Sequence, residues 1–370
     1  MNASTDNPRT GLSALRRIVV KIGSRAIIGG DRPGAMRFEA TADQIAALHA
    51  LGHQVVLVSS GAVAMGVQRL GLAGRPAELP QLQAAAAVGQ SKVMEAYEAA
   101  FQKHNIVVGQ VLLTHDGMAD RKRYLNARAA IDALLSLSAV PIINENDTVS
   151  TEEIEFGDND QLAAMVASLV GADLLVLLTD VEGLLDQDKV RIPLVEDIDQ
   201  VTELVWKHDS RVSLGGMASK LSAARRALMG GLPVVIAAAA DPLALTRILN
   251  GEDVGTLFLP VGTGLASRKH WIAHTLKARG TLVVDAGAAK ALSHNSSLLA
   301  AGIVRVEGSF HAGDAVRICT EDGEELARGL CRYDSRAVDM LCGAPSSEIQ
   351  SRVGHYEGDA VVHRDDLVMM

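Results

Sequence analysis

The chain has 370 residues, of which 48% are hydrophobic and 21% are charged, and its formal net charge is −9. The length favours two domains, and the composition is ordinary for a globular protein with a sizeable core. The negative charge argues against a general binder of nucleic acid or of anionic membranes, because both need basic surface.

The termini and the cysteines favour a cytoplasmic protein with no membrane attachment. The first residues, MNASTDNPRTGLSALRR, lack the apolar stretch of a secretory signal, and no apolar run reaches the roughly 18 residues of a membrane span. The three cysteines form no CxxC pair and are odd in number, so they suggest neither a disulfide framework nor a zinc site. We expect them to be small buried hydrophobes.

After a mobile tail predicted at residues 1–15, short apolar runs alternate with helical patterns up to about residue 260. Strands are predicted at 17–23, 54–61, 106–113, 139–144, 173–180 and 233–239. Helices are predicted at 41–52, 79–104, 123–136, 160–172 and 219–231. Strands that are apolar throughout and alternate with helices indicate a parallel sheet covered on both faces, so the fold class is α/β.

The character of the sequence changes near residue 265. The stretch LASRKHWIAHTLKARG at 265–280 holds four Lys or Arg and no acid, and we interpret it as a basic linker. Four short strand patterns follow, with the turn signals HAGD and EDGE between them. They predict a small, mostly β domain at 281–370, after an α/β domain at 16–264.

Four of the predicted strands end in residues that could carry chemistry. In open parallel sheets, ligands bind at the carboxyl ends of the strands. The stretches that follow those ends are Lys21 to Gly23, SSGAVAMG from Ser59, INENDTVSTEEIEFGDND from Ile143, and TDVEG from Thr179. We expect all four to lie at one edge of the sheet. Their convergence is stronger evidence for a ligand-binding site there than any single motif.

Lys21 interrupts an apolar pattern inside the first predicted strand. An edge strand with one solvated lysine is the alternative, but the neighbouring Ile and Val residues form the unbroken run of a buried strand. A lysine at the end of such a strand needs an anion to meet. The turn at Ser59–Gly61 and the stretch GGMASK at 215–220 offer backbone N–H groups to an anion, although ordinary capped or flexible turns also explain them.

The acidic stretch at 143–160 holds seven carboxylates and no Lys or Arg, although it directly follows a buried strand. A charge run is usually a solvated face. Familiar nucleotide-binding patterns are missing or incomplete: the chain contains no Walker A motif, GTGLAS at 262 has two of the three glycines of a dinucleotide fingerprint, and HRDD at 363 echoes a protein-kinase loop without its asparagine.

Seven motifs occur in one order along the chain: VVKIGS, VSSGAVAMG, AVGQSK, INEND, GDND, LLTDVEGL and GGMASK. In this order they resemble the bacterial glutamate 5-kinases of the amino acid kinase superfamily, from residue 17 to about 260, and the segment from about 280 resembles a PUA domain. The resemblance implies a three-layer sandwich with a mainly parallel sheet. It also implies ATP-dependent phosphorylation of the γ-carboxylate of L-glutamate, the first step of proline synthesis. The resemblance further implies a requirement for Mg²⁺ and feedback inhibition by L-proline. It also implies a homodimer or homotetramer and transfer of the product to the glutamyl phosphate reductase.

The resemblance also implies roles for individual residues. Lys21 and Lys220 match the catalytic lysine pair, and Asp160 would lie between them and orient them. The substrate would meet Ser60, Gly61, Asn144, Asp147, Asp158 and Asn159. The nucleotide would meet Thr179, Asp180, Gly215, Gly216 and Met217 together with the two lysines. No protein side chain is expected to bind the metal.

Two positions depart from the family pattern and several acids have no assigned role. Leu214 stands where a threonine is usual, and Leu185 stands where a tyrosine is usual, so contacts at both positions are in doubt. Glu152, Glu153 and Glu155 are interpreted as a solvated hairpin or as a surface near the proline-sensitive loop. Because a free glutamate carboxyl has a pKa of about 4.3, the nucleophile is already ionised, and the acids are not needed as bases. Catalysis would be positioning and cancellation of charge.

Three other functions remain open from the residues. A kinase of the same superfamily acting on aspartate, carbamate or UMP would share Lys21 and the glycine turns but not INEND followed by GDND. An RNA-binding protein is suggested by the PUA resemblance, although residues 281–370 hold 8 Lys or Arg and 14 Asp or Glu, and no nucleic acid is expected. A dinucleotide-dependent oxidoreductase rests on GTGLAS alone.

Overall fold

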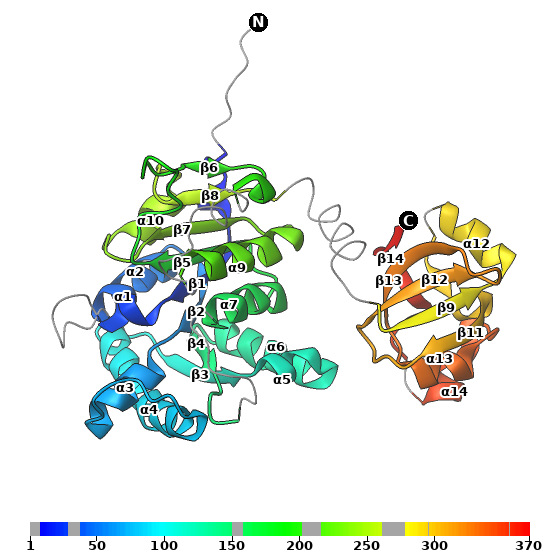
Figure 1. The fold of residues 1–370 in the computed structure, drawn as a ribbon, viewed down its shortest axis with the longest axis horizontal. Coiled ribbons are helices and arrows are strands. Elements are labelled where there is room, and N and C mark those ends of the chain that lie inside the picture. The colour runs from blue at the N-terminus through cyan, green and yellow to red at the C-terminus, as the bar shows by residue number, and fades with distance from the viewer. Residues whose placement is uncertain are drawn as a thin grey trace, which may run out of the picture. The chain divides into compact units, whose positions relative to one another are not determined.

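The structure is a computed structural model, and it describes residues 8–28, 38–149, 158–201, 216–260, 278–294, 296–354 and 356–370. The chain forms two compact units, one of residues 1–228 and 232–260 and one of residues 229–231 and 261–370 (Figure 1). Most of the basic stretch at 265–280, GTGLAS and Glu152, Glu153 and Glu155 lie outside the described residues.

The described part of the first unit contains an eight-stranded sheet in the order β3-β4-β2-β1-β5-β7-β8-β6. The strands are β1 Arg17–Ile22, β2 Gln54–Ser59, β3 Val108–Leu113, β4 Val140–Glu145, β5 Leu174–Thr179, β6 Leu194–Val195, β7 Val234–Ala238 and β8 Thr256–Phe258. The six strands from β3 to β7 are parallel, whereas β8 runs antiparallel to β7. The six predicted strands and the mainly parallel α/β sheet are therefore confirmed. The short strands β8 and β6, at one end of the sheet, were not predicted.

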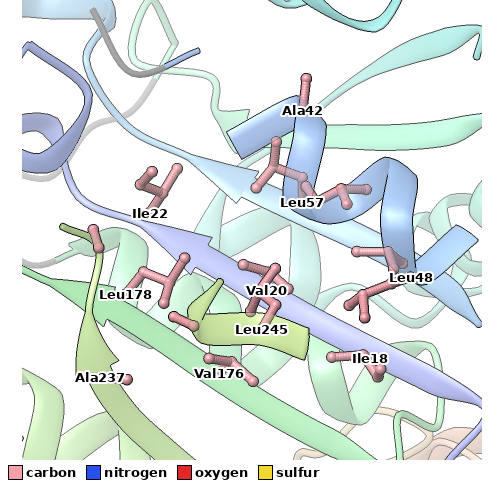
Figure 2. Packing of buried hydrophobic residues seen from close by; sticks show 14 of the residues in the cluster. Ile18, Val20, Ile22, Ala42, Leu48, Leu57, Val176, Leu178, Ala237 and Leu245 are labelled. Carbon is pink, nitrogen blue, oxygen red and sulfur yellow. The ribbon is translucent and has the colours of Figure 1, made fainter. Parts of the chain in front are cut away.

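Helices cover both faces of this sheet and make three layers (Figure 1). They are α1 Ser24–Ile28, α2 Phe38–Ala50, α3 Ala62–Leu70, α4 Leu79–Gln102, α5 His115–Ala119, α6 Arg121–Ser136, α7 Asp158–Leu169, α9 Met217–Met229 and α10 Ala244–Leu249. Ile18, Val20 and Ile22 pack in one cluster with residues of α2, α4 and α10, and Figure 2 shows Ala42 and Leu48 of α2 and Leu245 of α10 around β1. Val19 packs on the other face, with residues of α6, α7 and α9. Because side chains alternate along a strand, Lys21 shares the face of Val19.

Helices α3 and α4 touch backbone to backbone through two glycines. A Cβ atom added to Gly66 would lie 1.7 Å from the carbonyl oxygen of Ala85, and one added to Gly89 would lie 1.8 Å from that of Ala62. Only glycine permits this approach. The contact presses α4 onto the first turn of α3, directly after the turn that ends β2.

Residues 8–15 are packed against the first unit. Leu12, the first residue of the short 3₁₀ helix η1 Leu12–Ala14, is buried in its core. The guanidinium of Arg9 donates to the backbone carbonyls of Pro193, Glu252, Val254 and Gly255. This anchoring differs from the mobile tail expected for residues 1–15, because a buried arginine that satisfies several carbonyls ties the segment down.

The described part of the second unit contains a six-stranded sheet in the order β10-β14-β13-β12-β9-β11. The elements are β9 Gly280–Val284, α12 Ala286–Ser293, β10 Leu298–Leu299, η2 Ala300–Gly302, β11 Ile303–Gly308, β12 Ala315–Thr320, β13 Glu325–Cys331, α13 Ser335–Leu341, η3 Ser346–Glu348, α14 Ile349–Val353 and β14 Ala360–Met369. The four predicted strands are present, and a mostly β unit is confirmed. HRDD lies inside β14, so it forms no catalytic loop.

Cys319 and Cys331 are buried and Cys342 is half-buried, and all three are free thiols. Burial raises the pKa of Cys331 to about 12. The expectation of small buried residues thus holds for the first two. Among the described residues, no helix combines the length and the apolar character needed to cross a membrane.

Candidate active site

The ends of the four strands singled out in the sequence lie side by side. Strands β4, β2, β1 and β5 are consecutive neighbours and all parallel, so their carboxyl ends meet at one edge of the sheet. The first turn of α7, which carries Asn159 and Asp160, begins at the same edge, as does α9 with Lys220.

Two lysines share one buried carboxylate at this edge. The Nζ atom of Lys21 lies 2.5 Å from Oδ1 of Asp160, and the Nζ atom of Lys220 lies 3.3 Å from Oδ2. The side chains of Lys21 and Asp160 are 5% and 1% exposed, and that of Lys220 is 12% exposed. The solvated edge lysine considered for Lys21 is therefore wrong, because β1 has a parallel neighbour on each side.

The electrostatics of this trio leave it with an excess of positive charge. Burial lowers the pKa of Lys21, the charge of Asp160 raises it, and the nearby charge of Lys220 lowers it. With both lysines protonated, the trio itself holds two positive charges and one negative charge, and the charge of Asp180 also acts on Lys21. Such a site favours an incoming anion.

Helix α9 holds Lys220 in place. Lys220 lies in its first turn and donates a hydrogen bond of 3.2 Å from Nζ to the carbonyl oxygen of Gly216. Met217 begins the helix and packs against the core beside it. Gly215 and Leu214 lie outside the described residues.

Three of the proposed substrate residues form one hydrogen-bonded group. The Nδ2 atom of Asn159 lies 2.8 Å from Oγ of Ser60, 3.1 Å from Oδ1 of Asn144 and 3.2 Å from the carbonyl oxygen of Ser59. Gly61 follows with φ of +109°, a conformation that favours glycine, and it precedes α3 as its N-cap. The structure thus joins the ends of β2 and β4 to the first turn of α7.

The remaining predicted residues lie around this group with fewer described contacts. Asp147 is half-buried in the turn after β4, and Asp158 opens α7. On the opposite side, Thr179 ends β5 and donates from Oγ1 to Oδ1 of Asp180 at 3.0 Å. The charge of Asp180 raises the pKa of Lys21, which places that carboxylate near the lysine pair. Leu185 is 39% exposed.

Sequence reasoning missed three polar contacts next to this group. Gln90 of α4 accepts from Nδ2 of Asn144 at 2.6 Å, and Tyr97 of α4 shares a hydrogen bond of 3.0 Å with Oγ of the buried Ser59. His115 lies 3.3 Å from the buried carboxylate of Glu145. Gln90 falls within the motif AVGQSK, but a single polar residue in an alanine-rich helix carries no signal of its own.

The described residues contain no group of three or more His, Cys, Asp or Glu side chains that could hold a metal ion. Both oxygens of Asp160 already face lysines.

Comparisons with known proteins agree with this geometry. Residues 16–238 match the model of the amino acid kinase family, and residues 280–353 match that of the PUA domain. A glutamate 5-kinase of Trichlorobacter lovleyi is 47% identical over 371 residues, which cover 97% of this chain and 98% of that protein. A glutamate 5-kinase of Chromohalobacter salexigens is 48% identical over the full length of both.

Solved structures share the fold at lower identity. Carbamate kinase of Giardia aligns with a TM-score of 0.51 at 19% identity, covering 66% of this chain and 99% of that one. N-acetylglutamate synthase of Neisseria gonorrhoeae aligns with a TM-score of 0.53 at 19% identity, covering 70% of this chain and 64% of that one. With a family match over most of its length, a parallel sheet and paired lysines at the strand ends, this chain belongs to the amino acid kinase family.

Proposed function

We propose that the chain is a glutamate 5-kinase, which transfers the γ-phosphoryl group of ATP to the γ-carboxylate of L-glutamate and yields L-glutamyl 5-phosphate. The observation that carries the proposal is the buried Lys21–Asp160–Lys220 trio with its excess positive charge. The glutamate 5-kinases that match the chain over nearly its whole length support the choice of substrate.

The reaction needs little covalent chemistry from the protein. A carboxylate oxygen of glutamate forms a bond to the γ-phosphorus, the bond from that phosphorus to the bridging oxygen breaks, and ADP leaves with the electron pair. No proton has to move. The difficulty is that an anion must approach a polyanion, so catalysis consists of alignment and charge cancellation.

Lys21 and Lys220 supply the charge cancellation. Both would donate to oxygens of the transferring phosphoryl group, on which negative charge develops. Asp160 keeps the two ammonium groups within reach of each other in spite of their repulsion, because one carboxylate oxygen faces each of them.

The substrate side would be formed by the residues joined through Asn159. Asn144, Asp147, Asp158 and Asn159 would hold the amino-acid head group, with the carboxylates facing its α-ammonium. Ser60 and the backbone N–H at Gly61 would meet the reacting carboxylate. The acidic stretch can then lie beside ATP, because the substrate's ammonium group and the two lysines offset the repulsion between its carboxylates and the phosphates.

The nucleotide side would be formed by Thr179, Asp180, Gly215, Gly216 and Met217, together with the two lysines. Mg²⁺ in kinase sites is bound by one or two carboxylates and by the phosphates. Mg²⁺ would arrive with ATP and would neutralise phosphate charge. The chain's own contribution to the transfer remains the lysine pair.

The physiological setting belongs to the same proposal. A cytoplasmic enzyme of proline synthesis would be inhibited by L-proline, would assemble as a homodimer or homotetramer, and would pass its labile product to the glutamyl phosphate reductase. These features are supported by the resemblance alone, because the names of the relatives state only the kinase activity.

Hydroxylamine trapping tests the proposal, because hydroxylamine converts an acyl phosphate into a hydroxamate. The chain is incubated with ATP, Mg²⁺ and either L-glutamate, L-aspartate, carbamate or UMP, and both hydroxamate and ADP are measured. Hydroxamate and ADP formed only with glutamate are expected. ADP release with UMP or carbamate instead would assign the chain to another branch of the family.

A further inference from the structure

A chain of three side-chain amides crosses the substrate side of the site. Gln90 of α4 contacts Asn144 of β4, and Asn144 contacts Asn159 of α7. Each amide has a donor end and an acceptor end, so the direction in which each one points decides what the ends of the chain can bind.

Two backbone groups determine that direction. The backbone N–H of Glu145 donates to Oδ1 of Asn144 at 2.9 Å, so this oxygen is the acceptor and Nδ2 of Asn144 must donate to Oε1 of Gln90. The backbone carbonyl of Ser59 can only accept, so the atom of Asn159 that faces it is the donor Nδ2. A flip of either amide would set like atoms against each other.

The two ends of the amide chain are buried and have no hydrogen-bond partner within the described ranges. They are Nε2 of Gln90, a donor, and Oδ1 of Asn159, an acceptor. Buried polar groups in native proteins are nearly always paired, and leaving one unpaired costs its full desolvation free energy. A bound molecule with one acceptor and one donor would satisfy both.

The position of Gln90 is held on both sides. Gly89, its neighbour in the chain, lets α4 touch the first turn of α3, and Tyr97, two turns further along α4, bonds to Ser59. Gln90 is thereby fixed beside the turn after β2 and cannot withdraw without moving the helix. A side chain held in this way suits ligand recognition, which needs a fixed geometry, better than mere packing.

We propose that Gln90 binds the substrate: its Nε2 donates to the α-carboxylate of the amino acid, while Oδ1 of Asn159 accepts from the α-ammonium. An α-amino acid carries one acceptor, its carboxylate, and one donor, its ammonium group, which match in kind the donor of Gln90 and the acceptor of Asn159. The inference rests on the proposed function, because it names how that same site recognises its substrate. Gln90 thereby selects for a charged α-carboxylate against a neutral α-amide.

Substitution of Gln90 combined with a change of substrate tests the inference. Gln90→Met removes the donor at nearly constant volume, and we expect the KM for glutamate to rise about 10- to 100-fold, as for the loss of a hydrogen bond to a charged group. The KM for ATP is expected to stay within about twofold of wild type, a margin well below the cost of one hydrogen bond. Gln81→Met is the matched control, because Gln81 lies on the exposed face of the same helix, and it is expected to match wild type.

Gln90→Glu gives the sharper readout. It keeps an acceptor for Nδ2 of Asn144 but turns the donor into a carboxylate oxygen, which repels the α-carboxylate and accepts from an α-amide. The ratio of kcat/KM for glutamate over that for its α-amide is expected to fall at least about 100-fold, the scale on which sites discriminate through paired polar groups. Thermal unfolding identifies any variant that is not folded, and the wild-type chain itself is expected to prefer glutamate over the α-amide.

The outcomes separate this inference from the proposed function. A wild-type chain that forms no acyl phosphate from glutamate would overturn the proposed function. An active wild type with folded Gln90 variants that keep the normal KM and the normal preference for glutamate would overturn only the role of Gln90. Equal losses for glutamate, its α-amide and ATP would also overturn it, because they indicate damage to the packing.

Discussion

Lys21 and Asp160 are 139 positions apart in the chain, yet Nζ of one lies 2.5 Å from Oδ1 of the other inside the first unit. A lysine buried without a partner would lose its charge, because desolvation disfavours the ammonium form. The charge of Asp160 opposes that loss by raising the pKa of Lys21, whereas the nearby charge of Lys220 lowers this pKa and favours the loss. The pair therefore keeps a charged lysine at the end of a central strand, where a phosphoryl group can reach it.

Replacement of Lys21 tests its role in the transition state. Lys21→Met should lower kcat about 10²- to 10³-fold, because one stabiliser of developing charge is lost while Lys220 still pairs with Asp160. Circular dichroism should show an intact fold. Lys92→Met is the control, since Lys92 forms an exposed ion pair with Glu95, and it should leave kcat unchanged. Near-normal kcat in Lys21→Met would remove the lysine from the mechanism.

The pH dependence of activity should report the lowered pKa of Lys21. Catalysis needs the ammonium form, so kcat/KM should fall as the pH rises through a pKa below the ordinary lysine value of 10.5. Asp160 raises this pKa, so the residual activity of Asp160→Asn should fall at a lower pH than that of wild type. A decline in wild-type kcat/KM that begins only at or above 10.5 would contradict the assignment.

Stability should show the opposite trend in the same pH range. Between the lowered pKa and 10.5, the unfolded chain binds a proton at Lys21 that the folded chain does not. The contribution of Lys21 to the free energy of unfolding therefore rises with pH across this range. Denaturant titrations of wild type and Lys21→Met at several pH values, compared as differences, measure this contribution. A difference that stays constant or falls with pH would count against it.

The contact of α3 with α4 should tolerate no side chain at Gly89. In Gly89→Ala the new Cβ would lie 1.8 Å from a backbone oxygen, so the helices must separate. We expect the free energy of unfolding to fall by about 1–3 kcal/mol, although alanine favours the helix by about 1 kcal/mol. The KM for glutamate should rise as well, because Gln90 moves with α4.

Gly74→Ala is the control for this experiment. Gly74 has no atom within 4 Å of an added Cβ and lies in the loop after α3. The free energy of unfolding of the Gly74→Ala variant should differ from that of wild type by no more than about 0.5 kcal/mol. If both alanine variants had the same stability as wild type, the close helix contact would not exist in solution.

The second unit should not bind RNA, although RNA binding was an open function for this part of the chain. Nucleic-acid affinity comes largely from phosphate neutralisation by Lys and Arg. Residues 281–370 have 8 of these and 14 acids, and Arg305, Arg328 and Arg352 already pair with Glu307, Glu325 and Glu348. Fluorescence titration of the full chain with bulk tRNA at physiological salt should show no complex at micromolar concentration. A tighter complex would revive the RNA-binding hypothesis.

Much of the fold followed from local patterns. The apolar runs and the helical patterns between them predicted six parallel strands, because burial on both faces leaves no polar position in a strand. The same logic singled out Lys21, since a charged residue in such a run conflicts with its surroundings. The strands β6 and β8 were too short for any pattern, and Arg9 carried no signal, because the carbonyls that bind it come from the loops at 193 and 252–255.

By itself, the sequence determined the α/β class, the second mainly β unit and the strand ends that carry the candidate site residues. It could do so because the local spacing of apolar residues reflects which positions are buried. The tertiary structure alone decided which residues meet. The strand order β4-β2-β1-β5 joins Lys21 to Asp160 and Lys220, and the contact at Gly66 and Gly89 brings Gln90 beside Asn144. Partners so distant along the chain are selected by packing and by backbone donors and acceptors, and no local pattern encodes that selection.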